Sequence, residues 1–497
     1  MGNSRVLVDL SYYKPMNQKL LGNTIEWIDY ANGLLKEDLT YNFNFINRLN
    51  QIPINCLRFP GNKYSNGYDW CNGVGGISKR SFSLSNISNT TDSQITYAGI
   101  DEFLNLCSLF KAEPIFTMNV RTDDVQKVLS VVNYVNEKIN NCANCWIEND
   151  SVSENLPQCL YWEIGNNVYN DNSFYQNYMS YEDYFSVAYD LILGIKNINP
   201  YIKVGIPLAL NNILPNENLD WTENILNLLS QTNLPIDYFT IQNLSLPYAN
   251  NLSLSTNEIF KCLMTSSVYF ENYISQIKDK IKNKIEKNIP IAINEYAPIV
   301  TQDTTYASTF MAALYNADLI MSLSKIDDIL MANYSILNGS NDASLISENY
   351  DIRPTYYVFQ FLEKVLNGNA IKCKIDSTTF SNQNFGLVNK TDAEIIKTIG
   401  SYKSIPGGIR VSYLLLNKDS QYVTPVSILY RNKYIDKNQR IGSIKYYEAT
   451  EIYSSDLLST EISPNKIFVN SINDPIKIDL KPNSLTLLRI DYDLLID

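Results

Sequence analysis

Two short apolar runs in this sequence end in side chains that can transfer protons or attack carbon. The first, LYWEIGNN, carries Glu163 and Asn167, which alternation places on one face of an extended strand. The second, IPIAINEYAP, carries Glu295 at the carboxyl end of an apolar strand. Burying a carboxylate is costly unless it is paired. Glu295 is therefore either a catalytic nucleophile or a structural carboxylate paired with Arg58.

The chemistry that two such strand ends support is the hydrolysis of a glycosidic bond with retention. It needs two carboxyl groups about 5 Å apart, one that attacks and one that donates a proton and later takes it back. Glu295 can attack, but the amide of Asn167 cannot donate a proton at neutral pH. Losing the donor should cost about 10²–10⁴-fold for a poor leaving group. Glu163 lies about 13 Å from Asn167 by strand geometry, so we do not expect it to substitute.

These strand ends belong to a regular alternation of apolar strands and amphipathic helices. The predicted strands are Ile54–Phe59, Ile115–Val120, Leu160–Asn166, Ile202–Ile206, Ile236–Ile241, Ile289–Tyr296 and Ile329–Ile336. The predicted helices are Asn42–Leu49, Gly99–Lys111, Asp124–Ile139, Tyr181–Ile195, Trp221–Leu229, Asn272–Ile285, Ala307–Leu323 and Thr355–Leu366. This alternation predicts an α/β fold, a parallel (β/α)₈ TIM barrel over residues 21–374, with chemistry at the carboxyl ends of its strands.

The pattern changes after Gly368. Short alternating runs separated by turn residues follow, among them Ile409–Leu416, Thr424–Tyr430 and Ser484–Ile490. They predict a C-terminal antiparallel β-sandwich over residues 375–497.

Composition narrows the classes of partner. The net charge of −12 argues against nucleic acid and anionic membrane, and no apolar run is long enough for a membrane span. A neutral carbohydrate is compatible with this charge, and so is a homo-oligomer. No signal peptide is recognisable at the start, so we expect a cytoplasmic protein.

Metal ligands are scarce in this sequence. It contains no histidine, which removes the commonest metal ligand and the commonest general base. Cys142 and Cys145 form an isolated CxxC, which is either a redox pair, half of a zinc site or a pair of loop cysteines. Because no second pair accompanies it, we expect no metal and no cofactor.

Four segments resemble glycoside hydrolase family 51, the α-L-arabinofuranosidases, in the same order along the chain. They are LRFPGNKYSNGYDWCNGVGGISKR (57–80), YAGIDEFLNLCSLFKAEPIFTMNV (97–120), YWEIGNN (161–167) and INEYA (293–297). The run PIKIDLKPNSLTLLRI (475–490) is similar to the last strands of that family's sandwich. The resemblance covers almost the whole chain. It implies a barrel and a sandwich, with a strand within residues 1–20 joining the sandwich.

The resemblance also implies roles for individual residues. Glu295 corresponds to the nucleophile, and Asn167 stands where the family has its acid/base glutamate. Asn166 corresponds to a residue that helps hold the sugar 2-hydroxyl. The other expected substrate-binding residues are Arg58, Trp70, Asn119 and Gln242. Gln242 and Leu244 replace a histidine and an aromatic residue of the family's sugar subsite.

Two functions are compatible with these observations. The chain is either a retaining glycosidase acting on arabinofuranosides or related sugars, impaired by Asn167, or an inactive descendant. The inactive descendant would serve as a carbohydrate-binding, structural or interaction protein. Fold alone does not separate the two.

Overall fold

The structure is a computed structural model of the whole chain. It describes residues 4–11, 14–61, 63–80, 82–83, 93–94, 98–121, 123–142, 156–169, 179–209, 220–242, 255–298, 305–381 and 392–496.

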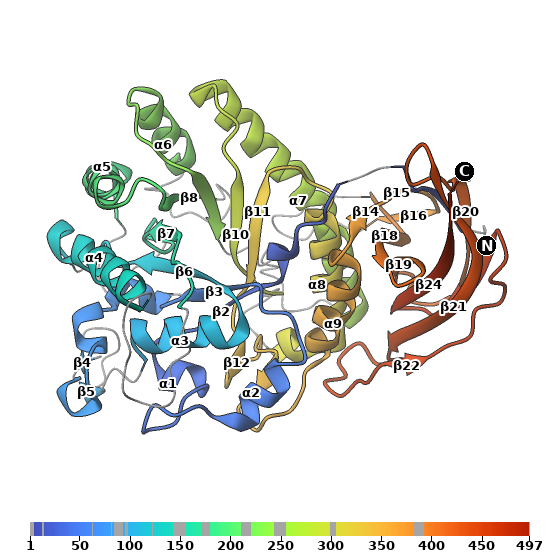
Figure 1. Cartoon of the computed structure of the whole chain (residues 1–497), viewed down its shortest axis with the longest axis horizontal. Coiled ribbons are helices and arrows are strands. Elements are labelled where there is room, and N and C mark those ends of the chain that lie inside the picture. The colour runs from blue at the N-terminus through green and yellow to red at the C-terminus, as the bar shows by residue number, and fades with distance from the viewer. Residues whose placement is uncertain are drawn as a thin grey trace.

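Within these ranges, eight parallel strands close into a barrel, as predicted (Figure 1). In chain order they are β2 (Gly22–Thr24), β3 (Cys56–Phe59), β6 (Glu113–Met118), β7 (Tyr161–Ile164), β8 (Lys203–Leu208), β9 (Tyr238–Gln242), β10 (Ile291–Tyr296) and β11 (Ile329–Tyr334). Each strand pairs in parallel with its neighbours, and β11 closes the barrel against β2. The fold class predicted from the sequence is therefore confirmed.

Strand β2 was not predicted. It is only three residues long, too short to form an apolar run. Gly22 is required there because a Cβ atom would lie 2.1 Å from Oδ1 of Asn333 on β11. A strand defined by close approach to its neighbour leaves no hydrophobic pattern in the sequence.

Helices connect the strands around the outside of the barrel. They are α1 (Asp29–Asn32), α2 (Phe43–Leu49), α3 (Ile100–Phe110), α4 (Val125–Cys142), α5 (Tyr181–Ile198), α6 (Trp221–Ser230), α7 (Thr256–Ile285), α8 (Phe310–Leu323) and α9 (Pro354–Leu366). The predicted start of α7 at Asn272 was wrong. The helix begins after Ser255, which forms a capping box with Glu258. Its first half is largely buried, so it lacks the charged face that marks the second half.

Beyond the barrel, two packed sheets form the sandwich in the described part of the chain. The first has the order β15–β1–β20–β23, and the second β14–β18–β19–β24–β21–β22. Their bounds are β1 (Ser4–Asp9), β14 (Asn369–Ala370), β15 (Lys372–Asp376), β18 (Ile396–Ile405), β19 (Gly408–Asn417), β20 (Thr424–Asn432), β21 (Gln439–Tyr453), β22 (Asn465–Lys466), β23 (Ile476–Leu480) and β24 (Ser484–Ile496). The N-terminal β1 pairs antiparallel with β15 and parallel with β20. After the barrel, the sandwich strands start with β14 at Asn369 and β15 at Lys372, a few residues before the predicted boundary at residue 375.

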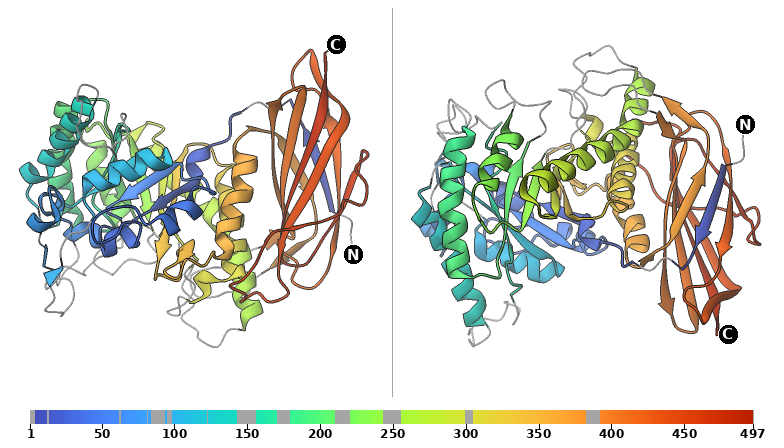
Figure 2. Two further views of the ribbon diagram at one scale, coloured as in Figure 1. Left: turned by 60° about the horizontal axis from the view of Figure 1, so that its bottom comes forward. Right: turned by 90° about the horizontal axis from the view of Figure 1, so that it is seen from above.

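The barrel and the sandwich meet across α8 and α9, which lie between them (Figures 1 and 2). Every residue of α8 is buried, which is the pattern of a helix covered on all sides. Leu414 and Leu416 of β19 and Leu485 and Leu487 of β24 belong to the same apolar cluster as the barrel helices. The second sheet thus packs directly on the barrel.

A buried ionic cluster lies at this junction. The carboxylate of Asp318 on α8 forms ion pairs with Nζ of Lys418 at 2.7 Å and with Nζ of Lys397 at 3.0 Å. Ser267 on α7 donates its hydroxyl to the same carboxylate at 2.5 Å. Two lysines from the sandwich are thereby joined to one aspartate of the barrel.

Candidate active site

The interior of the barrel is divided into an apolar and a polar layer. The apolar layer consists of Cys56, Ile115, Tyr238, Ala292 and Met331, one from each of five strands. Polar side chains lie further along the same strands toward their carboxyl ends, where TIM-barrel enzymes place their active sites.

Arg58 is the centre of the polar layer. Its guanidinium donates from Nε to Glu163 Oε2 at 2.7 Å, from Nη1 to Glu295 Oε1 at 2.7 Å and from Nη2 to Asn166 Oδ1 at 2.8 Å. Its side chain is fully buried. Burial alone would lower the pKa of Arg58, but the two carboxylates outweigh that effect and raise the pKa. Arg58 therefore stays charged and fixes the predicted site residues Glu295 and Asn166 relative to each other and to Glu163.

Glu163 is surrounded by hydrogen-bond donors and sealed from solvent, so a substrate cannot reach it for proton transfer. Its Oε2 accepts from Arg58 and, at 3.2 Å, from the hydroxyl of Thr117, and its Oε1 accepts from the amide of Asn294. The side chain is only 1% exposed. This geometry supports the expectation that Glu163 does not replace the missing acid.

Glu295 is turned toward Arg58 by an irregularity in β10. Asn294 pairs with Asn333 of β11 and Tyr296 pairs with Tyr334, so Glu295 is an extra residue in the register. Its φ of 64° lies in the left-handed region, which non-glycine residues rarely adopt. Regular alternation would have placed Asn294 and Glu295 on opposite faces, but the bulge lets both side chains enter the barrel.

The pairing of Glu295 with Arg58 was the structural alternative to catalysis, and that pairing exists. Nevertheless, Glu295 is 14% exposed, whereas Arg58 and Glu163 are sealed from solvent. One oxygen of the carboxylate is held by Arg58 at the open side of the polar layer. Strained backbone at a solvent-accessible carboxylate is a common feature of active sites.

The backbone also turns sharply after β7, which ends at Ile164. Gly165 has φ 82°, and a Cβ there would lie 2.8 Å from Val120. The extended strand predicted as far as Asn166 is therefore too long, and the spacing of 13 Å derived from it does not apply. The turn brings Asn166 to the same guanidinium as Glu163, whereas alternation had placed them on opposite faces.

Asn166 and Asn167 are held in different ways after this turn. The backbone of Asn166 is clamped by the amide of Asn66, which donates to its carbonyl at 2.7 Å and accepts from its N–H at 3.3 Å. Asn167 has φ 51° and is half-buried. Its buried Oδ1 has no hydrogen-bond partner among the described residues. Asn167 thus presents an unused acceptor.

The remaining predicted site residues are less closely connected. Asn119 donates to the carbonyl of Tyr68 at 3.2 Å and accepts from the N–H of Arg121, so it orders the loop that contains Asn66. Trp70 donates its indole N–H to the carbonyl of Lys127 on α4 at 3.1 Å and contacts Tyr134 of that helix. It does not join the hydrogen-bonded group around Arg58.

Gln242 ends β9, where it pairs in register with Asn294, and its side chain lies outside the described residues. Leu244 lies outside them as well. The role of Gln242 in substrate binding stays a prediction.

Sequence reasoning missed several members of this group. Asn66, Thr117 and Asn333 were not singled out, although Thr117 lies two residues after Ile115 on β6 and therefore on the same, inward face. Asn333 donates its amide to Asn294, and Asn294 donates to Glu163. An asparagine within a buried strand was the available signal, because such a residue needs hydrogen-bond partners.

The described residues form neither a candidate metal site nor a candidate membrane-spanning helix. They contain no group of three or more His, Cys, Asp or Glu side chains that could hold a metal ion. None of their helices is long and apolar enough to span a bilayer. Cys142 ends α4, and Cys145 lies outside the described residues.

Comparison with known families identifies the type of protein that this site resembles. The model of glycosyl hydrolases family 39 matches residues 158–402, which contain both strand ends that carry Asn167 and Glu295. The α-L-arabinofuranosidase 1 domain matches residues 48–205, which contain Arg58 and Asn166.

Individual relatives carry related names. A probable α-L-arabinofuranosidase C of Aspergillus fumigatus is 28% identical over 173 residues, which are 34% of this chain and 33% of that protein. The match thus spans about a third of the length of this relative. The intracellular exo-α-(1→5)-L-arabinofuranosidase 1 of Bacillus subtilis is 20% identical over 431 residues, 80% of this chain and 82% of its own.

Solved structures share the whole architecture. A family 51 α-L-arabinofuranosidase from Bifidobacterium longum superimposes with a TM-score of 0.78 at 14% identity, covering 98% of this chain and all of that one. The family 51 enzyme of Thermotoga petrophila gives 0.74 at 16% identity and covers 98% of this chain and 99% of its own. The chain therefore has an arabinofuranosidase-like glycoside hydrolase fold.

Proposed function

We propose that this protein is a retaining glycosidase for arabinofuranosides or closely related sugars. Glu295 is its nucleophile, and Asn167, which cannot transfer a proton at neutral pH, stands at the acid/base position. The observation that carries the proposal is the position of Glu295 on a bulge, held by Arg58 and still open to solvent. The substrate class is taken from the names of the relatives.

The first half of the reaction needs an ionised carboxylate aimed at the anomeric carbon. Arg58 places a positive charge beside Glu295 and binds one oxygen of its carboxylate, and this carboxylate attacks the anomeric carbon. Asn166 is held by Arg58 through Oδ1. Its Nδ2 is the atom that can donate to a sugar hydroxyl, the role that the family resemblance implies.

Both halves of the reaction lack the acid/base: the first for protonation of the leaving group, and the second for activation of water. Asn167 can accept a hydrogen bond but can neither protonate a leaving group nor activate water. Glu163 accepts hydrogen bonds from three donors and is sealed from solvent. The protein should therefore cleave substrates whose leaving group departs without protonation and then hold the glycosyl-enzyme for a long time.

A comparison of leaving groups tests this proposal. Dinitrophenyl α-L-arabinofuranoside should give a burst of about one equivalent of phenolate, followed by slow turnover that azide accelerates. Alkyl arabinofuranosides should not react. Asn167→Glu should raise turnover of nitrophenyl arabinofuranoside by about 10²-fold or more. The proposal fails if leaving-group acidity has no effect and Asn167→Glu changes nothing.

The second candidate function is carbohydrate binding without catalysis. Among the described residues the buried Oδ1 of Asn167 has no partner, which favours this function, because an unpaired buried acceptor costs about 1–3 kcal/mol unless a ligand satisfies it. Calorimetry with arabino-oligosaccharides, combined with the absence of any burst, would identify this case.

A cytoplasmic location remains part of the proposal, in keeping with the intracellular relative of Bacillus subtilis.

A further inference from the structure

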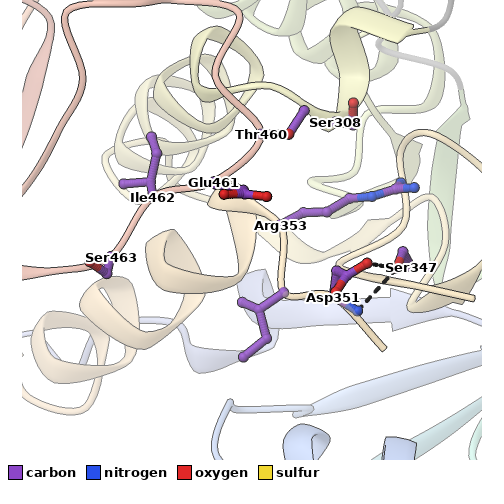
Figure 3. Close-up of a pocket in the computed structure, with 9 residues that line it drawn as sticks. Ser308, Ser347, Asp351, Arg353, Thr460, Glu461, Ile462 and Ser463 are labelled. Atoms are coloured by element: carbon purple, nitrogen blue, oxygen red, sulfur yellow. Dashed lines mark hydrogen bonds between the residues drawn. The ribbon is translucent and has the colours of Figure 1, made fainter. Parts of the chain in front are cut away.

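A second polar pocket lies on the catalytic face, where the sandwich touches the rim of the barrel. It has a volume of about 570 Å³, within the range of small-molecule sites. We call it the junction pocket. Its polar lining comes from Ser308, Ser347, Asp351, Arg353, Thr460 and Glu461 (Figure 3).

Connectivity places this pocket on the same face as Glu295. Ser308 lies between β10 and α8, and Asp351 and Arg353 lie between β11 and α9. Both connections follow strands at their carboxyl ends, and β10 carries Glu295. Thr460 and Glu461 come from the sandwich loop between β21 and β22. The pocket is therefore built by two neighbouring barrel connections and one sandwich loop.

The sandwich wall of the pocket is fixed to the barrel. The carbonyls of Ser459 and Leu457 accept hydrogen bonds from the N–H groups of Phe310 at 2.8 Å and Met311 at 2.9 Å. These two N–H groups are in the first turn of α8, where a helix lacks internal acceptors. The loop thus caps α8, which positions Thr460 and Glu461 beside the barrel rim.

The barrel wall is also preorganised. Nη1 of Arg353 donates to the carbonyls of Asn341, Asp342 and Ser344, which holds the guanidinium in place. The backbone N–H of Asp351 donates to the hydroxyl of Ser347 at 3.0 Å, and that hydroxyl donates to the carboxylate of Asp351 at 3.3 Å. Figure 3 shows Arg353 among the other polar groups of the pocket.

Three charged groups in the pocket remain available for a ligand. Asp351 and Glu461 line the same cavity as Arg353, and the charge of Asp351 acts on Arg353, although the two form no ion pair within 4.0 Å in the part of the chain that the structure describes. The carboxylates of Asp351, held by Ser347, and of Glu461 can accept hydrogen bonds from hydroxyl groups, and the guanidinium of Arg353 can donate them. Two carboxylates disfavour an anion, so the lining suits an uncharged molecule with many hydroxyl groups.

We propose that the junction pocket is a subsite for a neutral oligosaccharide, binding sugar units remote from the one attacked by Glu295. This inference rests on the function proposed above, and it gives the sandwich a part in substrate recognition. Affinity should then increase with the number of sugar units, up to the length that reaches the pocket.

Calorimetry with arabinose and a series of α-(1→5)-arabino-oligosaccharides tests the proposal. Thr460→Trp fills the pocket from the sandwich side, and Glu461→Gln removes one charge. Each should weaken binding of the longer oligosaccharides by about tenfold or more, and arabinose itself should bind equally to all proteins. The thermal midpoint of each variant shows whether it is folded.

A matched control is available at the same junction. Ser420 lines a neighbouring groove of about 390 Å³ that contains no basic side chain. Ser420→Trp should leave oligosaccharide binding within twofold of the wild type. The proposal is overturned if Thr460→Trp binds like the wild type, if Ser420→Trp weakens binding equally, or if the wild type shows no dependence on chain length. Covalent labelling of wild-type Glu295 reports separately on the proposed function.

Discussion

Replacing Asp318 by asparagine should weaken the junction between barrel and sandwich more than any change of similar size on the surface. Asp318 is fully buried and faces Lys418 at 2.7 Å and Lys397 at 3.0 Å. Asparagine keeps the shape but removes the charge, which leaves the buried Lys418 without its carboxylate and Lys397 with only the more distant Glu271, at 3.6 Å. Breaking a buried ion pair in this way costs about 3–5 kcal/mol.

The loss should depend on pH in a defined direction. Burial lowers the pKa of Lys418 from 10.5 to about 8, and the carboxylate of Asp318 opposes this shift. Without Asp318 the pKa of Lys418 in the folded protein falls further, while its pKa in the unfolded chain is unchanged. Lys418 of the folded variant then loses its proton at a lower pH than in the wild type. Above that pH the unfolded chain binds more protons than the folded one, so the stability of the variant begins to rise with pH before that of the wild type does. The difference from the wild type should therefore shrink as the pH rises toward about 8.

Urea unfolding at pH 6 and pH 8.5, followed by tryptophan fluorescence, measures both effects. Asp279→Asn, an exposed change on α7, is the control and should stay within about 0.5 kcal/mol of the wild type. Adding Lys418→Met to Asp318→Asn should recover part of the loss. A destabilisation below about 1 kcal/mol, or one that is equal at both pH values, would refute the account of this cluster.

Two further changes probe the site itself. Gly165→Ala should destabilise by about 1–3 kcal/mol in urea unfolding, because φ is 82° and the new methyl group would lie 2.8 Å from Val120. The control Gly76→Ala has no atom within 4 Å and should be neutral. Arg58→Lys should slow burst labelling of Glu295 by about 10²-fold, since one ammonium cannot make three fixed bonds. An unchanged labelling rate would remove Arg58 from the mechanism.

The architecture was predictable because it depends on patterns that persist along the chain. Apolar runs in the sequence predicted seven of the barrel strands, and alternating apolar and polar residues predicted the strands of the sandwich. No apolar run predicted β2, because this strand is defined by the close approach of Gly22 to Asn333 and not by hydrophobic residues. The first half of α7 was missed because a helix buried on most sides has no polar face.

The sequence singled out candidate site residues such as Glu295 and Asn166, but it missed Asn66 and did not predict the geometry that joins them. Sequence pattern placed Glu295 and Asn167 at strand ends, but both have left-handed backbone, at φ 64° and φ 51°. Alternation cannot foresee a bulge or a turn that reverses the direction of a side chain. For the same reason the shared contact of Glu163 and Asn166 with Arg58 became visible only in the structure.

The central claim is that Glu295 is a competent nucleophile without an acid/base partner. The most direct test is mass spectrometry of the protein after reaction with dinitrophenyl α-L-arabinofuranoside, with peptide mapping of the product. The account predicts one pentosyl group per chain, attached to Glu295, stable in buffer, released by azide and absent in Glu295→Gln. A protein that carries no sugar, or that carries it on another residue, would contradict the account.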